Sequence, residues 1–71
     1  MSATVIDIMV NGEARRVPAT TTVAQVIETM GVNAATVVAE VSGTIIVPEQ
    51  FATTTLAAGA QVELVRFVGG G

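Results

Sequence analysis

The chain has 71 residues, of which 51% are hydrophobic and 13% are charged, and its formal net charge is −3. This length allows one small domain, and the high hydrophobic fraction excludes an intrinsically disordered chain. The chain has three arginines and no lysine, which are too few basic residues for a phosphate-binding surface. The chain lacks cysteine and histidine, which excludes disulfides, thiolate or imidazole metal ligands and Ser-His-Asp catalysis. No apolar stretch is long enough to span a bilayer, and the N-terminus lacks the basic region of a signal peptide. We therefore expect a cytoplasmic domain without a metal site, a nucleic-acid partner or a membrane partner.

The first predicted element is a β-hairpin. Residues 5–10 are rich in β-branched side chains and indicate a strand. Asn11-Gly12 follows, and this dipeptide favours a type I′ turn, which needs positive φ at both central positions. We assign these two residues to turn formation and to nothing else. Residues 13–17 then return as a shorter strand, whose two arginines suit an exposed sheet edge.

A short helix follows the hairpin. Thr22 and Gln25 have the spacing of a capping box, in which each side chain accepts from the main-chain N–H of the other residue. Gly31 is the expected left-handed residue that ends the helix. An apolar stripe recurs at helical spacing and is predicted to face the core: Val23, Val26, Ile27 and Met30.

Three further strands are predicted at residues 36–41, 44–47 and 61–67. Ser42-Gly43 is a tight turn between the first two. Residues 48–55 form an irregular crossing segment, with Phe51 and Leu56 as its anchors to the core. Because the first and last strands of the chain are the most apolar, we expect them to lie together at the centre of the sheet.

These elements predict an α+β domain with a mixed four- to five-stranded sheet packed on one helix, the pattern of the ubiquitin-like β-grasp. We assign residues 1–67 to this domain and residues 68–71 to a flexible glycine tail. Glycine has no Cβ, so such a tail can thread a narrow channel in another protein. A carboxylate on Gly71 is therefore the best candidate for a working group.

Four segments together resemble the ThiS family of sulfur-carrier proteins of thiamin biosynthesis. The segments are Val10-Asn11-Gly12-Glu13, Val47-Pro48, Val62-Glu63-Leu64-Val65 and Phe67-Val68-Gly69-Gly70-Gly71. The resemblance covers essentially the whole chain. Two positions depart from the family pattern: Glu49 stands where an arginine is frequent, and Gly59-Ala60 stands where Gly-Asp is frequent.

The resemblance implies a protein cosubstrate and not an enzyme. An adenylating partner of the ubiquitin-activating type would use ATP and magnesium to convert the Gly71 carboxylate to an acyl-adenylate. Sulfur from a persulfide protein would then replace AMP and give a thiocarboxylate, with Gly70 as the slim approach to it. Thiazole synthase would accept the sulfur. The chain itself is expected to bind no cofactor.

A docking surface for these partners is expected beside the tail. In the last strand, Val65 and Phe67 lie on the face opposite Val62 and Leu64, and exposed apolar side chains next to an active tail suggest a contact surface. The predicted partner-binding residues are Phe67, Val65, Val68, Gly69 and Arg66.

Three other functions share parts of this pattern. The molybdopterin-synthase small subunit uses the same fold and terminal thiocarboxylate, but its sulfur goes to a pterin precursor, and its members are usually longer. A ubiquitin-like protein modifier shares the activation step and is then joined covalently to lysines of target proteins. A passive binding module would need neither glycine at the end of the tail.

Overall fold

The computed structural model describes residues 4–66, which form a five-stranded sheet, one α-helix and one 3₁₀ turn. The elements in chain order are β1 (Val5–Val10), β2 (Glu13–Pro18), α1 (Val23–Met30), β3 (Val37–Val41), β4 (Thr44–Ile46), the 3₁₀ turn η1 (Pro48–Gln50) and β5 (Gln61–Arg66).

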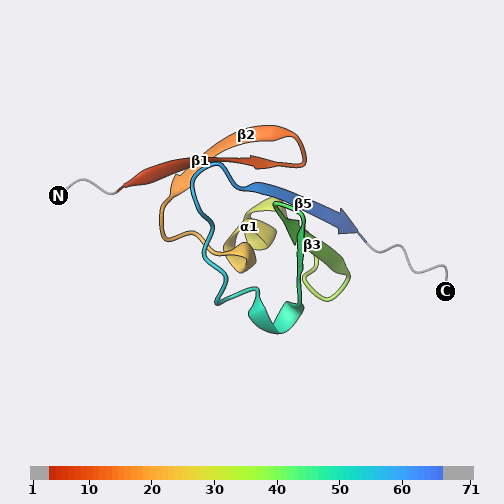
Figure 1. The fold of residues 1–71 in the computed structure, drawn as a ribbon. Helices are drawn as coiled ribbons and strands as arrows, with labels where there is room; N and C mark the ends of the chain where they lie inside the picture. Colours follow the sequence, from red (N-terminus) through yellow and green to blue (C-terminus); the bar gives the residue numbers. More distant parts are fainter. Residues whose placement is uncertain (1–3, 67–71) are drawn as a thin grey trace.

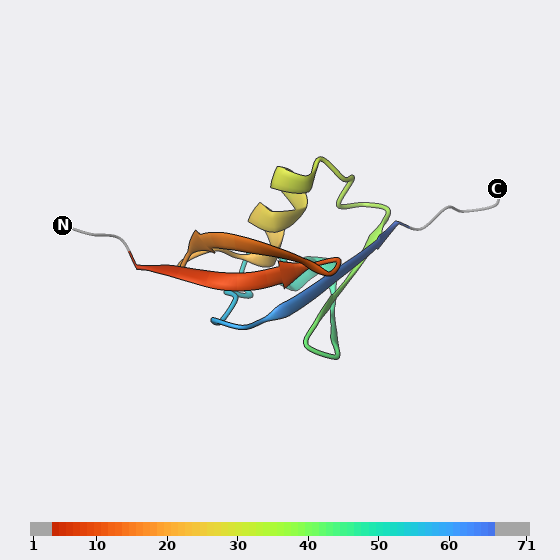
Figure 2. The same ribbon diagram turned by 90° about the horizontal axis from the view of Figure 1, so that it is seen from above.

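The sheet has the strand order β2-β1-β5-β3-β4. β1 and β5 run parallel, and the other neighbouring pairs are antiparallel. The helix covers one face of this twisted sheet, and the opposite face is not covered by any described element (Figure 1, Figure 2). The expected ubiquitin-like β-grasp is confirmed, with β1 and β5 together in the middle of the sheet.

Two hairpin turns give the sheet its geometry. Asn11 and Gly12 have φ of 50° and 83°, and Ser42 and Gly43 have φ of 47° and 91°. Positive φ at both central positions defines a type I′ turn, whose twist matches that of the flanking strands. The predicted turn at Asn11-Gly12 is therefore confirmed, and Ser42-Gly43 forms a second turn of the same kind.

The predicted capping box closes the N-terminus of α1. The Gln25 amide donates to Thr22 Oγ1 at 3.3 Å, and the Thr22 amide donates to Gln25 Oε1 at 2.9 Å. At the other end, Gly31 adopts φ of 73° and its amide donates to the Glu28 carbonyl at 3.1 Å. Of the predicted apolar stripe, three side chains are buried, whereas Met30 is only half-buried at the rim.

The crossing segment satisfies amides that the helix alone leaves unpaired. The first N–H groups of a helix have no partner within it. Here the Val23 amide donates to the Thr54 carbonyl at 3.0 Å, and the Ala24 amide donates to the Phe51 carbonyl at 2.9 Å. Phe51 and Leu56 are both buried, so their predicted role as anchors is confirmed. The segment is more regular than expected, because it begins with η1.

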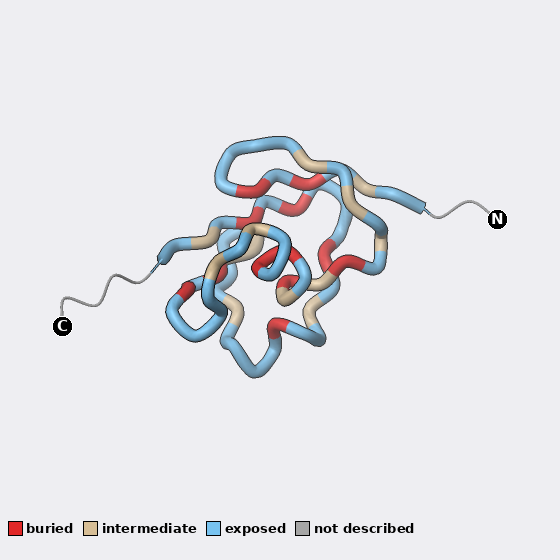
Figure 3. The backbone as a smooth tube through the Cα atoms, turned by 180° about the vertical axis from the view of Figure 1, so that it is seen from behind, coloured by how far each residue is buried: buried red, intermediate tan, exposed pale blue. Residues whose placement is uncertain are grey.

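The core lies between α1 and the inner face of the sheet (Figure 3). Alternate side chains of each strand point to it, and the four most deeply buried large side chains are Ile8, Val10, Val23 and Val62. Among residues 4–66, no helix has the length and apolar character needed to cross a bilayer.

The observed strand ends differ from the predicted ones by single residues. β2 includes Pro18, whose Cα pairs with that of Val5. β3 begins at Val37 because the Thr36 amide donates to the Asn33 carbonyl at 3.0 Å, which holds it in a turn. β4 ends at Ile46. β5 reaches Arg66, and its predicted last residue, Phe67, lies outside the described residues.

Two isoleucines test which face of the sheet forms the core. Ile8 is 1% exposed and Ile45 is 64% exposed. Replacing Ile8 by Ala removes buried methyl groups and leaves a cavity, so Ile8→Ala should lower the free energy of unfolding by about 2–5 kcal/mol. Ile45→Ala is the matched control and should change it by less than about 0.5 kcal/mol. Urea denaturation followed by circular dichroism measures both, and equal losses would contradict the assignment.

Candidate functional site

β5 leads directly to the glycine-rich end of the chain. Arg66 is the last residue of β5 and is paired with Val37 at the start of β3. The predicted residues Phe67, Val68, Gly69, Gly70 and Gly71 lie outside the described residues. What the structure defines is therefore the base of the tail: the strand that carries it and the surface around that strand.

The side chain of Asn11 continues the ladder between β1 and β5. The Met9 amide donates to the Ala60 carbonyl and the Asn11 amide donates to the Val62 carbonyl, both at 2.9 Å. In an evenly spaced parallel ladder, the Leu64 amide would next donate to the main-chain carbonyl of residue 11. It donates instead to Asn11 Oδ1 at 2.9 Å. β5 thus keeps a partner at a point where β1 has already turned away.

This bond corrects the prediction that Asn11 serves turn formation alone. Asn11 accepts the positive φ of the turn and also supplies an acceptor to β5, 53 positions further along the chain. Sequence reasoning missed this role because it depends on which strand lies beside the hairpin. The available signal was the residue type, since glycine would form the same turn without offering an acceptor.

Ser42 makes a comparable contact on the other side of β5. The Ser42 amide donates to the Gln61 carbonyl at 2.7 Å, and the Gln61 amide donates to Ser42 Oγ at 3.2 Å. Asn11 and Ser42 are each the first of the two central residues of a type I′ turn. β5 is therefore held on both edges by turn side chains as well as by main-chain ladders.

An apolar patch lies over β3, β4 and β5, on the face of the sheet that α1 does not cover. It consists of Val38, Ile45, Val47 and Val65, which are 41–64% exposed. Val38 and Val65 are directly opposite each other on neighbouring strands. Val47 follows Ile46, the partner of Ala39, so the same register places it across from Val38. Exposed apolar groups gathered in this way are typical of interaction surfaces.

Two carboxylates lie next to this patch. Glu40 and Glu63 are directly opposite each other on β3 and β5, and Ile45 is the other neighbour of Glu40. Like charges in directly opposite positions destabilise a sheet. The patch is therefore bordered by negative charge that a cation on another protein would neutralise.

Two of the predicted docking residues lie in the part of the chain that the structure describes. Val65 is 59% exposed and belongs to the apolar patch, and Arg66 is exposed at the end of β5. Of the two departures from the family pattern, Glu49 is exposed in η1, whereas Ala60 is buried. Within the described residues, no group of three or more acidic side chains is placed to hold a metal ion.

Comparisons with known proteins agree with this geometry. The family model described as "ThiS family" matches residues 8–71. The fold is similar to the crystal structure of the thiamine biosynthesis protein (ThiS) from Geobacter metallireducens, with a TM-score of 0.79 and 30% sequence identity over 93% of this chain and 100% of that chain. Among curated proteins, no significant match is found.

The Asn11 contact can be tested without disturbing the turn. Asn11→Gly keeps a residue that readily adopts positive φ but removes the acceptor for the Leu64 amide. We expect the free energy of unfolding to fall by about 1 kcal/mol and the Leu64 amide to exchange its hydrogen faster. Asn11→Asp keeps an acceptor oxygen and tolerates this φ, so it should preserve the protection of Leu64. Unchanged exchange at Leu64 in Asn11→Gly, measured by NMR, would contradict the assigned role.

Proposed function

We propose a specific chemistry for this chain, which belongs to the ThiS family and is a sulfur carrier protein. The sulfur is carried as a thiocarboxylate on Gly71 and is donated to form the thiazole ring of thiamin. The observation that carries the proposal is the extent of the family match, which continues from the β-grasp domain through Gly70 and Gly71.

Activation of the carboxylate is the first step of this chemistry. A carboxylate is a poor electrophile, so an adenylating enzyme would join a Gly71 oxygen to the α-phosphorus of ATP, with magnesium as its counterion, and release pyrophosphate. A persulfide sulfur then attacks the acyl carbon and expels AMP, and a thiol cleaves the resulting S–S bond to leave the thiocarboxylate. Covalent activation of this kind divides one difficult step into easier ones.

The composition of the chain assigns most of this chemistry to its partners. A chain without cysteine or histidine offers no thiolate to bring sulfur and no imidazole to transfer protons. Its own contribution would be the acyl group and a tail whose terminal residues have no Cβ. Gly70 and Gly71 can then approach a nucleotide closely, which a side chain would hinder.

The apolar patch is the proposed docking surface for the activating enzyme and for thiazole synthase. It lies on β3, β4 and β5, and β5 is the strand that leads to the tail. We include Arg66 and the residues that follow, Phe67, Val68 and Gly69, in the proposed interface because they come directly after Val65 in the sequence. Glu40 and Glu63 favour a partner surface that places a basic residue beside its apolar centre.

A truncation tests the role of the tail. Deleting Gly70 and Gly71 leaves the described domain of residues 4–66 unchanged, so the variant should fold normally by circular dichroism. Incubated with the adenylating enzyme, ATP, magnesium and a persulfide source, the full chain should gain the mass difference between sulfur and oxygen, and the truncated chain should gain nothing. Deleting Ser2 and Ala3 is the matched control at the other end and should not affect the gain. Sulfur transfer by the chain without Gly70 and Gly71 would contradict the proposal.

A second test addresses the patch. Val65→Asp places a charge where a partner must remove water, so the affinity for the adenylating enzyme should fall at least about tenfold, or 1.4 kcal/mol. Val5→Asp is the matched control, because Val5 is also about half exposed and lies on the same face. In the parallel register of β1 and β5, Val65 lies level with position 13, which is eight residues from Val5. The two sites are therefore separated by roughly 26 Å along the strand direction, at about 3.3 Å per residue. Isothermal titration calorimetry measures both, and equal affinities would exclude the patch as the docking surface.

A further inference from the structure

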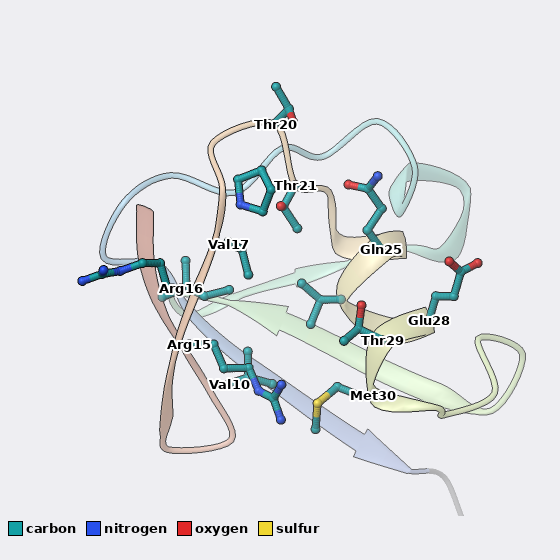
Figure 4. Close-up of a pocket in the computed structure, with 13 residues that line it drawn as sticks. Val10, Arg15, Arg16, Val17, Thr20, Thr21, Gln25, Glu28, Thr29 and Met30 are labelled. Carbon is teal, nitrogen blue, oxygen red and sulfur yellow. The ribbon is translucent and has the colours of Figure 1, made fainter. Parts of the chain in front are cut away.

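A groove lies between β2 and α1, on the face of the sheet that the apolar patch does not occupy. Its volume is about 390 Å³. The side chains of Val10, Val17 and Val26 line it as apolar groups, and Gln25 and Thr29 of α1 line it as polar groups (Figure 4). The groove has room for a few side chains from another molecule.

Arg15 points into this groove and has an unmet hydrogen bond. Figure 4 shows its guanidinium group between β2 and Met30 at the end of α1, whereas Arg16 points away. The Nε atom of Arg15 is buried and has no hydrogen-bond partner among the described residues. A buried donor without a partner lowers the stability of the fold, and more so when the group is charged. Arg15 forms no ion pair among the described residues, so a carboxylate that entered the groove would pair with its planar guanidinium group.

The groove runs beside a free strand edge. β2 is the outermost strand on its side of the sheet, and within residues 4–66 only β1 pairs with it. Val10 and Glu13 flank the two-residue turn as a hydrogen-bonded pair, and bonded and non-bonded pairs alternate along an antiparallel ladder. The main-chain N–H and C=O groups of Ala14 and Arg16 therefore point away from β1. They are available to pair with another extended chain.

We propose that the edge of β2 and this groove together bind an extended segment of another protein that carries aliphatic side chains and one carboxylate. The segment adds a strand to β2 through the main chain of Ala14 and Arg16. Its alternate side chains enter the groove, where the aliphatic ones meet Val17 and Val26 and the carboxylate pairs with Arg15. This is a binding activity separate from sulfur transfer, because the groove and the apolar patch lie on opposite faces of the sheet.

The charges favour a different protein over a second copy of this chain as the occupant. Pairing β2 with β2 of another copy would bring Arg15 and Arg16 of both copies to one edge, and like charges in neighbouring positions oppose pairing. Glu28 also lines the groove, on the helix side. The carboxylate of the segment is therefore placed at the Arg15 end of the groove, and the position nearest Glu28 takes an uncharged side chain.

Peptide titrations observed by NMR test the proposal. The probes are capped heptapeptides in which valines alternate with threonines, with one aspartate replacing a different valine in each peptide. At least one peptide should shift the amides of Ala14, Arg16 and the residues around Thr29, and should show main-chain NOEs to Ala14 and Arg16. Aspartate to asparagine in that peptide should weaken binding roughly 10- to 100-fold, as expected for loss of a charge-assisted hydrogen bond.

Variants of the protein complete the test. Arg15→Gln should weaken binding of the aspartate peptide by the same factor and should leave binding of the asparagine peptide unchanged. Glu49→Gln is the control and should change neither, because Glu49 is exposed in η1 and does not line the groove. The comparison of the two peptides needs no change in the protein, so it stands even if a variant folds poorly.

Three results would overturn the proposal. The first is no shift with any of the peptides at about 1 mM, which places the dissociation constant beyond the range of useful recognition. The second is binding that does not distinguish aspartate from asparagine. The third is peptide binding elsewhere, seen as amide shifts at Val38 and Val65 of the apolar patch, or self-association of the protein through β2, which would block the peptide.

Discussion

The hydrogen bonds along both edges of β5 are the constraint on which the rest of the structure depends. β5 is the middle strand, with β1 parallel on one side and β3 antiparallel on the other. It carries the inner-face residue Val62, the patch residue Val65 and the connection to the tail. A shift of β5 by one residue would exchange its two faces, bury Val65 and expose Val62. The register of one strand therefore decides both the core and the proposed docking surface.

Main-chain pairing with β1 cannot secure this register alone, because its ladder to β5 has only two paired positions. Asn11 and Ser42 extend the hold by offering side-chain oxygens to amides of β5. Both residues sit in the left-handed region, which type I′ turns require and which asparagine in particular tolerates. The turns thus serve two purposes: they reverse the chain, and they fix the strand that leads to the tail.

The sequence predicts the elements of this fold well and the contacts between distant elements poorly. The capping box at Thr22, the left-handed Gly31 and the Asn11-Gly12 turn follow from local patterns, and the structure confirms each of them. The exposure of Val65 follows from strand alternation. The role of the Asn11 side chain and the unmet hydrogen bond of Arg15 depend on which strand or helix lies opposite, so local patterns could not reveal them. Arg15 and Arg16 look alike in sequence, and only their alternation across β2 separates the side chain that points into the groove from the one that pairs with Asp7.

The division of the sheet into two faces explains how so small a chain can serve several partners. One face of the sheet must be covered by α1 to form a core, and only the outer face and the margins remain for binding. The patch on β3, β4 and β5 lies on the outer face, next to the strand that bears the tail. The groove lies on the inner face, where α1 does not reach the edge of β2. A partner on the patch needs access to the tail, whereas a partner in the groove meets only β2 and α1. Occupation of the groove is therefore compatible with the proposed activation at Gly71, and the two proposed binding surfaces can act independently.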